Sequence, residues 1–215
     1  MIIFLWYFSC ILIGYLLGNI NTAAIIARCK GFDIRSKGSG NAGASNAFLT
    51  MGKRAAVCSA LVDILKAFLP VCLLLHVISY PQACSHLPVV TGVSVILGHM
   101  FPFWMQFRGG KGFASLLGMV LALKWQFFLF CIGILAIILL ATRYIAVATM
   151  ICAASLPVFW FFQTGDLLEV LILAVLAVII IFKHTPNIKR IMNGTEIPLR
   201  FQKHAAKSGA EQSSK

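Results

Sequence analysis

The sequence is short of charge, and above all short of negative charge. Only 11% of its 215 residues are charged, against roughly 25% in a soluble domain. Just 6 Asp and Glu stand against 18 Lys and Arg, and hydrophobic residues make up 60% of the chain. This composition excludes an ordinary soluble domain and indicates an integral membrane protein. In such a protein the net charge of +12 predicts basic cytoplasmic loops and contact with membrane lipids, with no nucleic-acid partner.

The cysteines and acidic residues offer no pattern for a disulfide framework or a metal. The 7 cysteines contain no C-x-x-C pair and lie mostly in apolar runs, where free cysteine behaves as a small hydrophobe. On the side expected to be cytoplasmic, the acids before the tail are Asp33, Asp63 and Glu196, too few for a metal-dependent carboxylate site. We therefore expect no metal and no cofactor. His76 and His86 fall on the outer side and are expected to have no role.

Several familiar catalytic motifs are also absent. The chain has no H-x-x-x-x-D acyltransferase dyad, no G-x-S-x-G nucleophile elbow and no P-loop pattern. The glycines Gly38, Gly40 and Gly43 fit the spacing of a dinucleotide fingerprint, but no βαβ unit surrounds them. We therefore interpret that match as accidental.

Apolar runs define the expected architecture, an all-α polytopic membrane protein. They lie near 2–24, 55–79, 87–105, 113–123, 126–141, 144–162 and 167–183. The fourth run is shorter than the roughly 20 residues of an ordinary spanning helix, and we expect it to cross as a short helix inside the bundle. Seven transmembrane helices, with the N-terminus outside and the C-terminus cytoplasmic, place the basic loops inside. We expect a single membrane domain over residues 1–200 and a disordered polar cytoplasmic tail over 201–215.

Three polar stretches interrupt this sequence, and the topology places all of them on the cytoplasmic side. They are GSGNAGASN (38–46), FRGGKGFAS (107–115) and KHTPNIKRIMNGTE (183–196). In the first stretch, glycines allow backbone N–H groups to point into one concavity and bind an anion, while Ser and Asn side chains add donors. A flexible linker at the membrane edge is the alternative interpretation of this stretch.

The second and third stretches add cations and a histidine. Arg108 and Lys111 flank a glycine pair, and the helix that follows would direct its N-terminal N–H groups at the same loop. An ordinary basic turn is the alternative. His184 and Asn187 are three residues apart and would share a face of a short surface helix, which is either functional or structural.

Polar residues also occur inside the apolar segments. Asp63 and Lys66 are three apart on one helix and form either a functional site or a structural ion pair. His99 lies in the third apolar run, which leads to the second stretch. Because donors dominate on the cytoplasmic side, the sequence predicts a phosphate-bearing, lipid-linked substrate that is held by positioning and charge stabilisation.

The three stretches, in this order, resemble the three motifs of the bacterial acyl-phosphate:glycerol-3-phosphate acyltransferases, the PlsY family. The similarity covers residues from about 10 to 200 and includes DILK at 63–66. It implies a multi-pass enzyme of the bacterial cell membrane with its active site facing the cytoplasm. Such an enzyme moves an acyl group from acyl phosphate to glycerol 3-phosphate and releases lysophosphatidate and phosphate.

The resemblance implies roles for individual residues. It implies catalytic roles for Ser39, Lys111, His184 and Asn187, with either His184 or a substrate phosphate oxygen as the base. Glu196 would mainly support the fold. The residues expected to bind or surround substrate are Gly38, Gly40, Asn41, Gly43, Ser45, Asn46, Lys53, Arg54, His99, Arg108, Gly109, Gly110, Gly112 and Glu196.

One departure from the family pattern concerns a phosphate-binding arginine. The family usually carries Arg at the position of Leu49. An aliphatic side chain does not replace a bidentate phosphate clamp, so Lys53 or Arg54, one turn on, would have to compensate. The alternatives are a diverged member with another acceptor, or a small membrane carrier of a phosphorylated solute. A carrier would need polar access from both sides, and the outer loops carry no matching polar cluster.

Overall fold

The computed structural model describes residues 1–198, and within that range every regular element is helical. The expected all-α architecture is therefore confirmed for the described residues. The tail expected over 201–215, and the last two residues of the 1–200 domain, lie outside them. The helices are α1 (Ile2–Gly18), α2 (Thr22–Cys29), α3 (Ala44–Met51), α4 (Lys53–His76), α5 (Leu87–Met100), α6 (Phe113–Leu123), α7 (Trp125–Ala141), α8 (Ile145–Thr164), α9 (Leu167–Lys183) and α10 (Thr185–Met192), with single 3-10 turns η1 (Ile34–Ser36), η2 (Gln82–Cys84) and η3 (Phe103–Met105).

Apolar helices follow the predicted apolar runs in order. Over residues 1–198, 4 helical segments are long and apolar enough to cross a membrane, namely Ile2–Cys29, Lys53–His76, Gln82–Met105 and Ile145–Thr164. A fifth segment passes the same test if α9 and α10, which meet at 44°, are taken together. The helices α6 and α7 are apolar but shorter. The bounds of α6 coincide with the expected short fourth helix, whereas the number of crossings stays a prediction.

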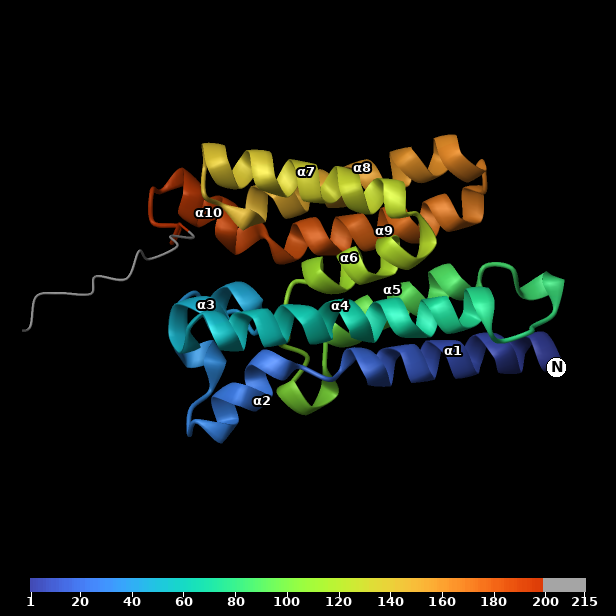
Figure 1. Ribbon diagram of the computed structural model, residues 1–215, viewed down its shortest axis with the longest axis horizontal. Helices are drawn as coiled ribbons and strands as arrows, with labels where there is room; N and C mark the ends of the chain where they lie inside the picture. Colours follow the sequence, from blue (N-terminus) through green and yellow to red (C-terminus); the bar gives the residue numbers. More distant parts are fainter. Residues whose placement is uncertain (199–215) are drawn as a thin grey trace, which may run out of the picture.

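The helices form two layers with α6 between them (Figure 1). One layer contains α1, α4 and α5, and the other contains α7, α8 and α9; the helix α6 contacts α4, α5 and α7. Figure 1 shows α3 and α10 at one end of the bundle, which we call the α3–α10 end. The N-terminus and the loops that precede α5 and α9 lie at the opposite end, which we call the far end. This arrangement brings the three polar stretches to the same end of the molecule.

The position of α6 depends on Gly118, which lies against the backbone of α4. A side chain at Gly118 would bring its Cβ within 2.9 Å of the backbone carbonyl carbon of Ile64. On the same helix Leu116, Met119 and Val120 are all fully buried. Close approach of backbone to backbone therefore seats this short helix in the core.

Two buried asparagines fix the break between α1 and α2. Asn21 caps α2, because its Oδ1 accepts a hydrogen bond from the backbone N–H of Ala24 at 2.9 Å, and its Nδ2 donates to the carbonyl of Ala42 at 2.9 Å. The Oδ1 of Asn19 accepts from the N–H of Phe103 at 2.9 Å. The break thus holds both the first polar stretch and the loop that leads to the second.

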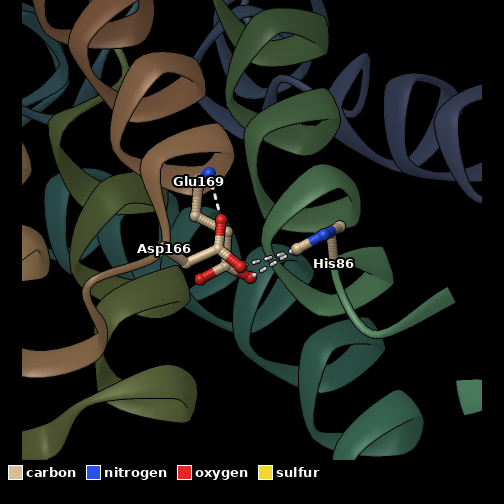
Figure 2. A group of neighbouring side chains, drawn as sticks. All are labelled: His86, Asp166 and Glu169. Atoms are coloured by element: carbon tan, nitrogen blue, oxygen red, sulfur yellow. Dashed lines mark hydrogen bonds and ion pairs between the residues drawn. The ribbon is translucent and has the colours of Figure 1, made fainter. Parts of the chain in front are cut away.

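An ion-pair cluster joins the two layers at the far end, where Figure 2 shows His86 facing Asp166 and Glu169. The Nδ1 of His86 lies 3.4 Å from Oδ2 of Asp166 and 3.3 Å from Oε1 of Glu169. The second oxygen of each acid is also used: Oδ1 of Asp166 caps α9, and Oε2 of Glu169 accepts from the indole N–H of Trp160 at 2.6 Å. His86 thus ties the start of α5 to the start of α9, and the expectation that it has no role in function stays a prediction.

Candidate active site

A cavity of about 260 Å³ lies at the α3–α10 end and receives side chains from all three polar stretches. It also reaches α4 at Asp63 and α6 at Phe113. Of the residues that we expected in the site, those that line it are Ser39, Asn41, Gly43, Ser45, His99, Lys111, Gly112, His184, Asn187 and Glu196. The convergence that the topology predicts is thus present in the fold.

Other expected site residues lie behind the cavity wall or outside it. They are Gly38, Gly40, Asn46, Lys53, Arg54, Arg108, Gly109 and Gly110. Lys53 and Arg54, the first two residues of α4, are exposed and do not line the cavity, whereas Leu49 does. The compensation that we expected from Lys53 or Arg54 finds no support in this geometry.

The first stretch is organised around the buried side chain of Asn46. Its Oδ1 accepts a hydrogen bond from the N–H of Ser39 at 2.8 Å. Its Nδ2 donates to the carbonyls of Ile34 at 2.9 Å and Lys37 at 3.0 Å. Gly38, with φ of 60°, leaves room for this amide, because a Cβ there would meet the Asn46 side chain. Asn46 therefore shapes the loop, while Ser39 is left to face the cavity.

The N-terminus of α3 points its free backbone donors at the same cavity. Gly43 is the N-cap and makes no side-chain capping bond, and Gly43, Ala44 and Ser45 all line the cavity. Unpaired N–H groups and the positive end of the helix dipole favour an anion at such a position. The hydroxyl of Ser39 and the amide of Asn41 lie on the same wall.

The second stretch folds back onto the end of α5. The N–H of Gly109 donates to the carbonyl of Met100, and the N–H of Gly110 donates to the carbonyl of His99, both at 3.1 Å. A side chain at Gly110 would collide with the His99 imidazole. These two glycines therefore position the loop, and Lys111 is the residue that presents a charge to the cavity.

A chain of polar contacts connects Lys111 to the third stretch. The Lys111 ammonium donates to the side-chain oxygen of Asn187. The amide of Asn187 donates to Oε1 of Glu196 at 2.5 Å, and Oε2 of Glu196 accepts from Nε of Arg190 at 2.6 Å. Burial, together with the positive charges of Arg190 and Lys183, lowers the pKa of Lys111 to about 8, while Glu196 opposes the shift. Lys111 is thus a cation near neutral pH with a titration point close to the physiological range.

His184, at the junction of α9 and α10, is buried and neutral. Burial lowers the pKa of His184 to about 4, with the charge of Lys111 acting in the same direction. Its Nδ1 lies 2.8 Å from the carbonyl of Ile180. A carbonyl only accepts, so we assign the proton to Nδ1, which leaves Nε2 as a free acceptor. A neutral imidazole with a free Nε2 is suited to accept a proton.

Asp63, Lys66 and His99 form a buried polar cluster within the membrane segments, next to the cavity. The ammonium of Lys66 lies 2.7 Å from Oδ1 of Asp63 and 2.9 Å from Nδ1 of His99. It also donates to the carbonyls of Gly18 at 3.0 Å and Ile20 at 2.6 Å, at the break between α1 and α2. Asp63 and His99 both line the cavity. The pair of Asp63 and Lys66 therefore braces three helices at the base of the site.

The cluster of His86, Asp166 and Glu169 is the group within residues 1–198 that has metal-ligand spacing, with one ligand atom from each residue all within 4.8 Å of one another. Its residues stand at the starts of α5 and α9, which lie at the far end, away from α3 and α10 (Figure 1). None of its three residues lines the cavity.

Sequence reasoning missed several cavity residues. Arg143 and Tyr144, in the turn between α7 and α8, line the cavity, as does Thr149 on α8. A basic residue in a turn on the cytoplasmic side is typical of any membrane protein. The one available signal was that this turn lies on the same side as the three polar stretches.

These features define a class, that of helical membrane proteins with a cationic, donor-rich cavity suited to a phosphate-bearing substrate. The family model for glycerol-3-phosphate acyltransferase matches residues 8–194. This chain belongs to the glycerol-3-phosphate acyltransferase family, and the resemblance inferred from the three stretches is confirmed. It is a multi-pass membrane protein and an acyltransferase.

Individual relatives cover most of the chain. A glycerol-3-phosphate acyltransferase of Prochlorococcus marinus (strain MIT 9215) is 35% identical over 186 residues, which is 85% of this chain and 92% of that protein. A crystal structure of PlsY, an integral membrane glycerol 3-phosphate acyltransferase in its glycerol 3-phosphate form, matches with a TM-score of 0.82 at 32% identity and covers 91% of this chain and 99% of that one. The lysophosphatidic acid form matches with a TM-score of 0.78 at 32% identity, over 90% of this chain and 95% of that one.

Proposed function

We propose that this chain transfers a fatty acyl group from acyl phosphate to glycerol 3-phosphate, giving 1-acylglycerol 3-phosphate and inorganic phosphate in phospholipid synthesis. The observation that carries the proposal is the meeting of Ser39, Lys111 and His184 in one cavity. The matching PlsY structures were solved in glycerol 3-phosphate and lysophosphatidic acid forms, which correspond to the acceptor and the product of this reaction.

His184 is the base that we assign to the acceptor hydroxyl. It is uncharged near pH 7 because its pKa lies at about 4, and its Nδ1 is occupied by the carbonyl of Ile180. Its Nε2 would take the proton as the hydroxyl oxygen bonds to the acyl carbon. A phosphate oxygen of the substrate is the other base that the reaction allows. His184→Ala separates the two, because only the first assignment predicts loss of kcat with binding retained.

Lys111 and the N-terminus of α3 would stabilise the departing phosphate. When the bond between the acyl carbon and the phosphate oxygen breaks, negative charge grows on the leaving group. Donors that are already in place lower the barrier to such a step. The Lys111 ammonium, the Ser39 hydroxyl and the free N–H groups of α3 line the same cavity. Because phosphate is a good leaving group, the transfer runs directly between the substrates, with no covalent enzyme intermediate.

We place the protein in the bacterial cell membrane, with seven crossings, the N-terminus outside and the cavity facing the cytoplasm. Supporting this topology, the N-terminus and the α3–α10 end lie at opposite ends of the bundle (Figure 1). The loop between α2 and α3 carries Arg35 and Lys37, the loop between α5 and α6 carries Arg108, and the turn between α7 and α8 carries Arg143. Each of these loops contributes residues to the cavity. Basic loops of membrane proteins remain in the cytoplasm.

The test is phosphate release from palmitoyl phosphate by the detergent-purified protein, with and without glycerol 3-phosphate. We expect release that depends on the acceptor, and a fall of about a hundredfold or more in Ser39→Ala, the size of effect seen when one donor to a developing oxyanion is removed. Ser155→Ala on α8, which lies outside the cavity, is the matched control. A micelle has no second compartment, so turnover there would exclude the carrier. Release that ignores glycerol 3-phosphate would contradict the proposal and favour another acceptor.

A further inference from the structure

The cavity contains a second cation, which enters from a part of the chain outside the three polar stretches. Arg143 lies in the turn between α7 and α8 and lines the cavity together with Lys111. Within residues 1–198, these two are the Lys or Arg residues on the cavity wall. Two phosphorylated substrates carry more negative charge than the ammonium of Lys111 alone can balance, and Lys111 is already bonded to Asn187.

Arg143 holds a backbone conformation that arginine seldom adopts. Its φ is 62°, in the left-handed region that favours glycine. Its N–H closes α7 by donating to the carbonyl of Leu139 at 3.1 Å, and the hydroxyl of Thr142 accepts the N–H of Tyr144 at 3.2 Å. Glycine would make this turn without strain. An arginine held there against its backbone preference points to a use for the side chain.

The guanidinium of Arg143 is free to bind a ligand. In the described part of the chain its side chain makes no hydrogen bond, ion pair or ring contact, and the residue is exposed at the cavity wall. Two other arginines near this end are already paired, Arg35 with Asp33 and Arg190 with Glu196, and Arg54 and Arg108 do not line the cavity. Arg143 is therefore an uncommitted cation beside a site that needs one.

We propose that Arg143 is a substrate-binding residue, the second cationic anchor for a substrate phosphate in this cavity. The inference rests on the proposed function and names a contact of that same site. The planar guanidinium offers two parallel N–H donors to a phosphate group, which the ammonium of Lys111 does not. From the α7–α8 turn, Arg143 supplies a cationic contact to phosphate that the aliphatic Leu49, on the α3 side of the cavity, cannot supply. The phosphate is that of glycerol 3-phosphate or that of the acyl donor, and the experiment distinguishes them.

The test compares Arg143→Gly and Arg143→Lys with the wild type in steady-state assays that vary each substrate in turn. Glycine removes the side chain and suits the positive φ, so the variant should keep or raise its Tm. We expect a rise of about ten- to a hundredfold in the KM for one phosphate substrate, the effect of losing a hydrogen-bonded contact to a charged group. The kcat should change much less. The KM of Arg143→Lys should fall between that of the wild type and that of Arg143→Gly. The substrate whose KM rises identifies the phosphate that Arg143 holds.

Lys30→Ala is the matched control, because Lys30 is an exposed cation outside the cavity. Arg143→Gly with a KM within twofold of this control for both substrates would overturn the role of Arg143 and leave the proposed function intact. If the wild type shows no acceptor-dependent turnover, the proposed function fails instead. A calorimetric titration of glycerol 3-phosphate and of inorganic phosphate into wild type and Arg143→Gly then decides on Arg143 alone. If wild type and Arg143→Gly bind each ligand with the same affinity, Arg143 does not hold the phosphate.

Discussion

The ammonium of Lys111 donates to the side-chain oxygen of Asn187, and this contact joins two polar stretches that lie 76 positions apart in the chain. Asn187 in turn donates to Glu196, so one amide holds both a cation and a carboxylate in place. Asn187→Ala should therefore release Lys111 and lower kcat/KM by about ten- to a hundredfold, the effect of removing a hydrogen bond to a charged group. Asn193→Ala, just past α10 and outside the cavity, is the matched control for steady-state kinetics. Equal kcat/KM values for the two variants would contradict this role of Asn187.

The pH dependence of the reaction should report Lys111. The pKa of Lys111 is lowered to about 8 by burial and by Arg190. The ammonium is needed to hold phosphate, so kcat/KM should be level below pH 8 and fall as the pH rises through that value. Arginine stays protonated to much higher pH, and Lys111→Arg should shift the alkaline fall upward by two pH units or more. An alkaline limb at the same pH in both proteins would assign the titration to another group.

The amide of Asn46 should be required for the shape of the first stretch. Asn46→Asp keeps the acceptor for the N–H of Ser39 but loses the donor to the carbonyls of Ile34 and Lys37. It also places a charge at a fully buried position. We expect a lower Tm and a loss of several-fold or more in affinity for glycerol 3-phosphate, measured by thermal unfolding and by titration. A variant with unchanged Tm and affinity would show that the loop does not depend on this amide.

Two helical glycines provide a paired test of the core. Gly118→Ala forces a Cβ against the backbone of Ile64 and should destabilise the protein by about 1–3 kcal/mol, the usual penalty for overpacking. Gly133→Ala on α7 meets no atom within 4 Å and should be neutral or stabilising, because alanine favours a helix. Thermal unfolding in one detergent compares the two. Equal Tm values would contradict the close packing of α6 on α4.

The cluster at the far end should contribute to stability and leave catalysis unchanged. Glu169→Ala leaves the buried indole N–H of Trp160 without its acceptor and should cost about 1–3 kcal/mol. Glu169→Gln keeps an acceptor and should cost less, as should His86→Ala, which removes only the partly exposed ion pairs with Asp166 and Glu169. The Tm should be lowest in Glu169→Ala and higher in Glu169→Gln and His86→Ala, with kcat/KM equal in all three variants. A large loss of activity in His86→Ala would link this end to the cavity.

Much of the fold followed from the chemistry of the sequence. The fourth helix was expected at residues 113–123 because they form a short apolar run, and α6 occupies those residues. The convergence of the three polar stretches followed from hydrophobic segments that return the chain to the same face. These are strong signals because burying polar backbone or charge in lipid is costly.

The finer details of the site could not be predicted from spacing alone. Lys53 and Arg54 were expected one turn after Leu49, but Gly52 has φ of 86° and separates α3 from α4, so a helical count does not carry across it. Gly109 and Gly110 were expected to present N–H groups to phosphate, yet those groups donate to carbonyls of α5. Both outcomes depend on the local direction of the backbone, which glycine leaves open in the sequence.

Arg143 is a residue that the sequence alone did not single out as part of the site. Its residue type and position look ordinary in the sequence, because basic residues are common in cytoplasmic turns. Its value as a candidate ligand comes from a positive φ and from a cavity wall built by distant segments. Only the assembled fold places it in the same cavity wall as Lys111.

The most direct test of the account is mass-spectrometric detection of 1-palmitoylglycerol 3-phosphate made from palmitoyl phosphate and glycerol 3-phosphate by the purified protein. We predict product formation by the wild type and by Lys30→Ala, and loss of product in Lys111→Ala and His184→Ala while both remain folded. Absence of the product from the wild type, or its undiminished formation by both cavity variants, would contradict the assignment of this cavity as an acyl-transfer site.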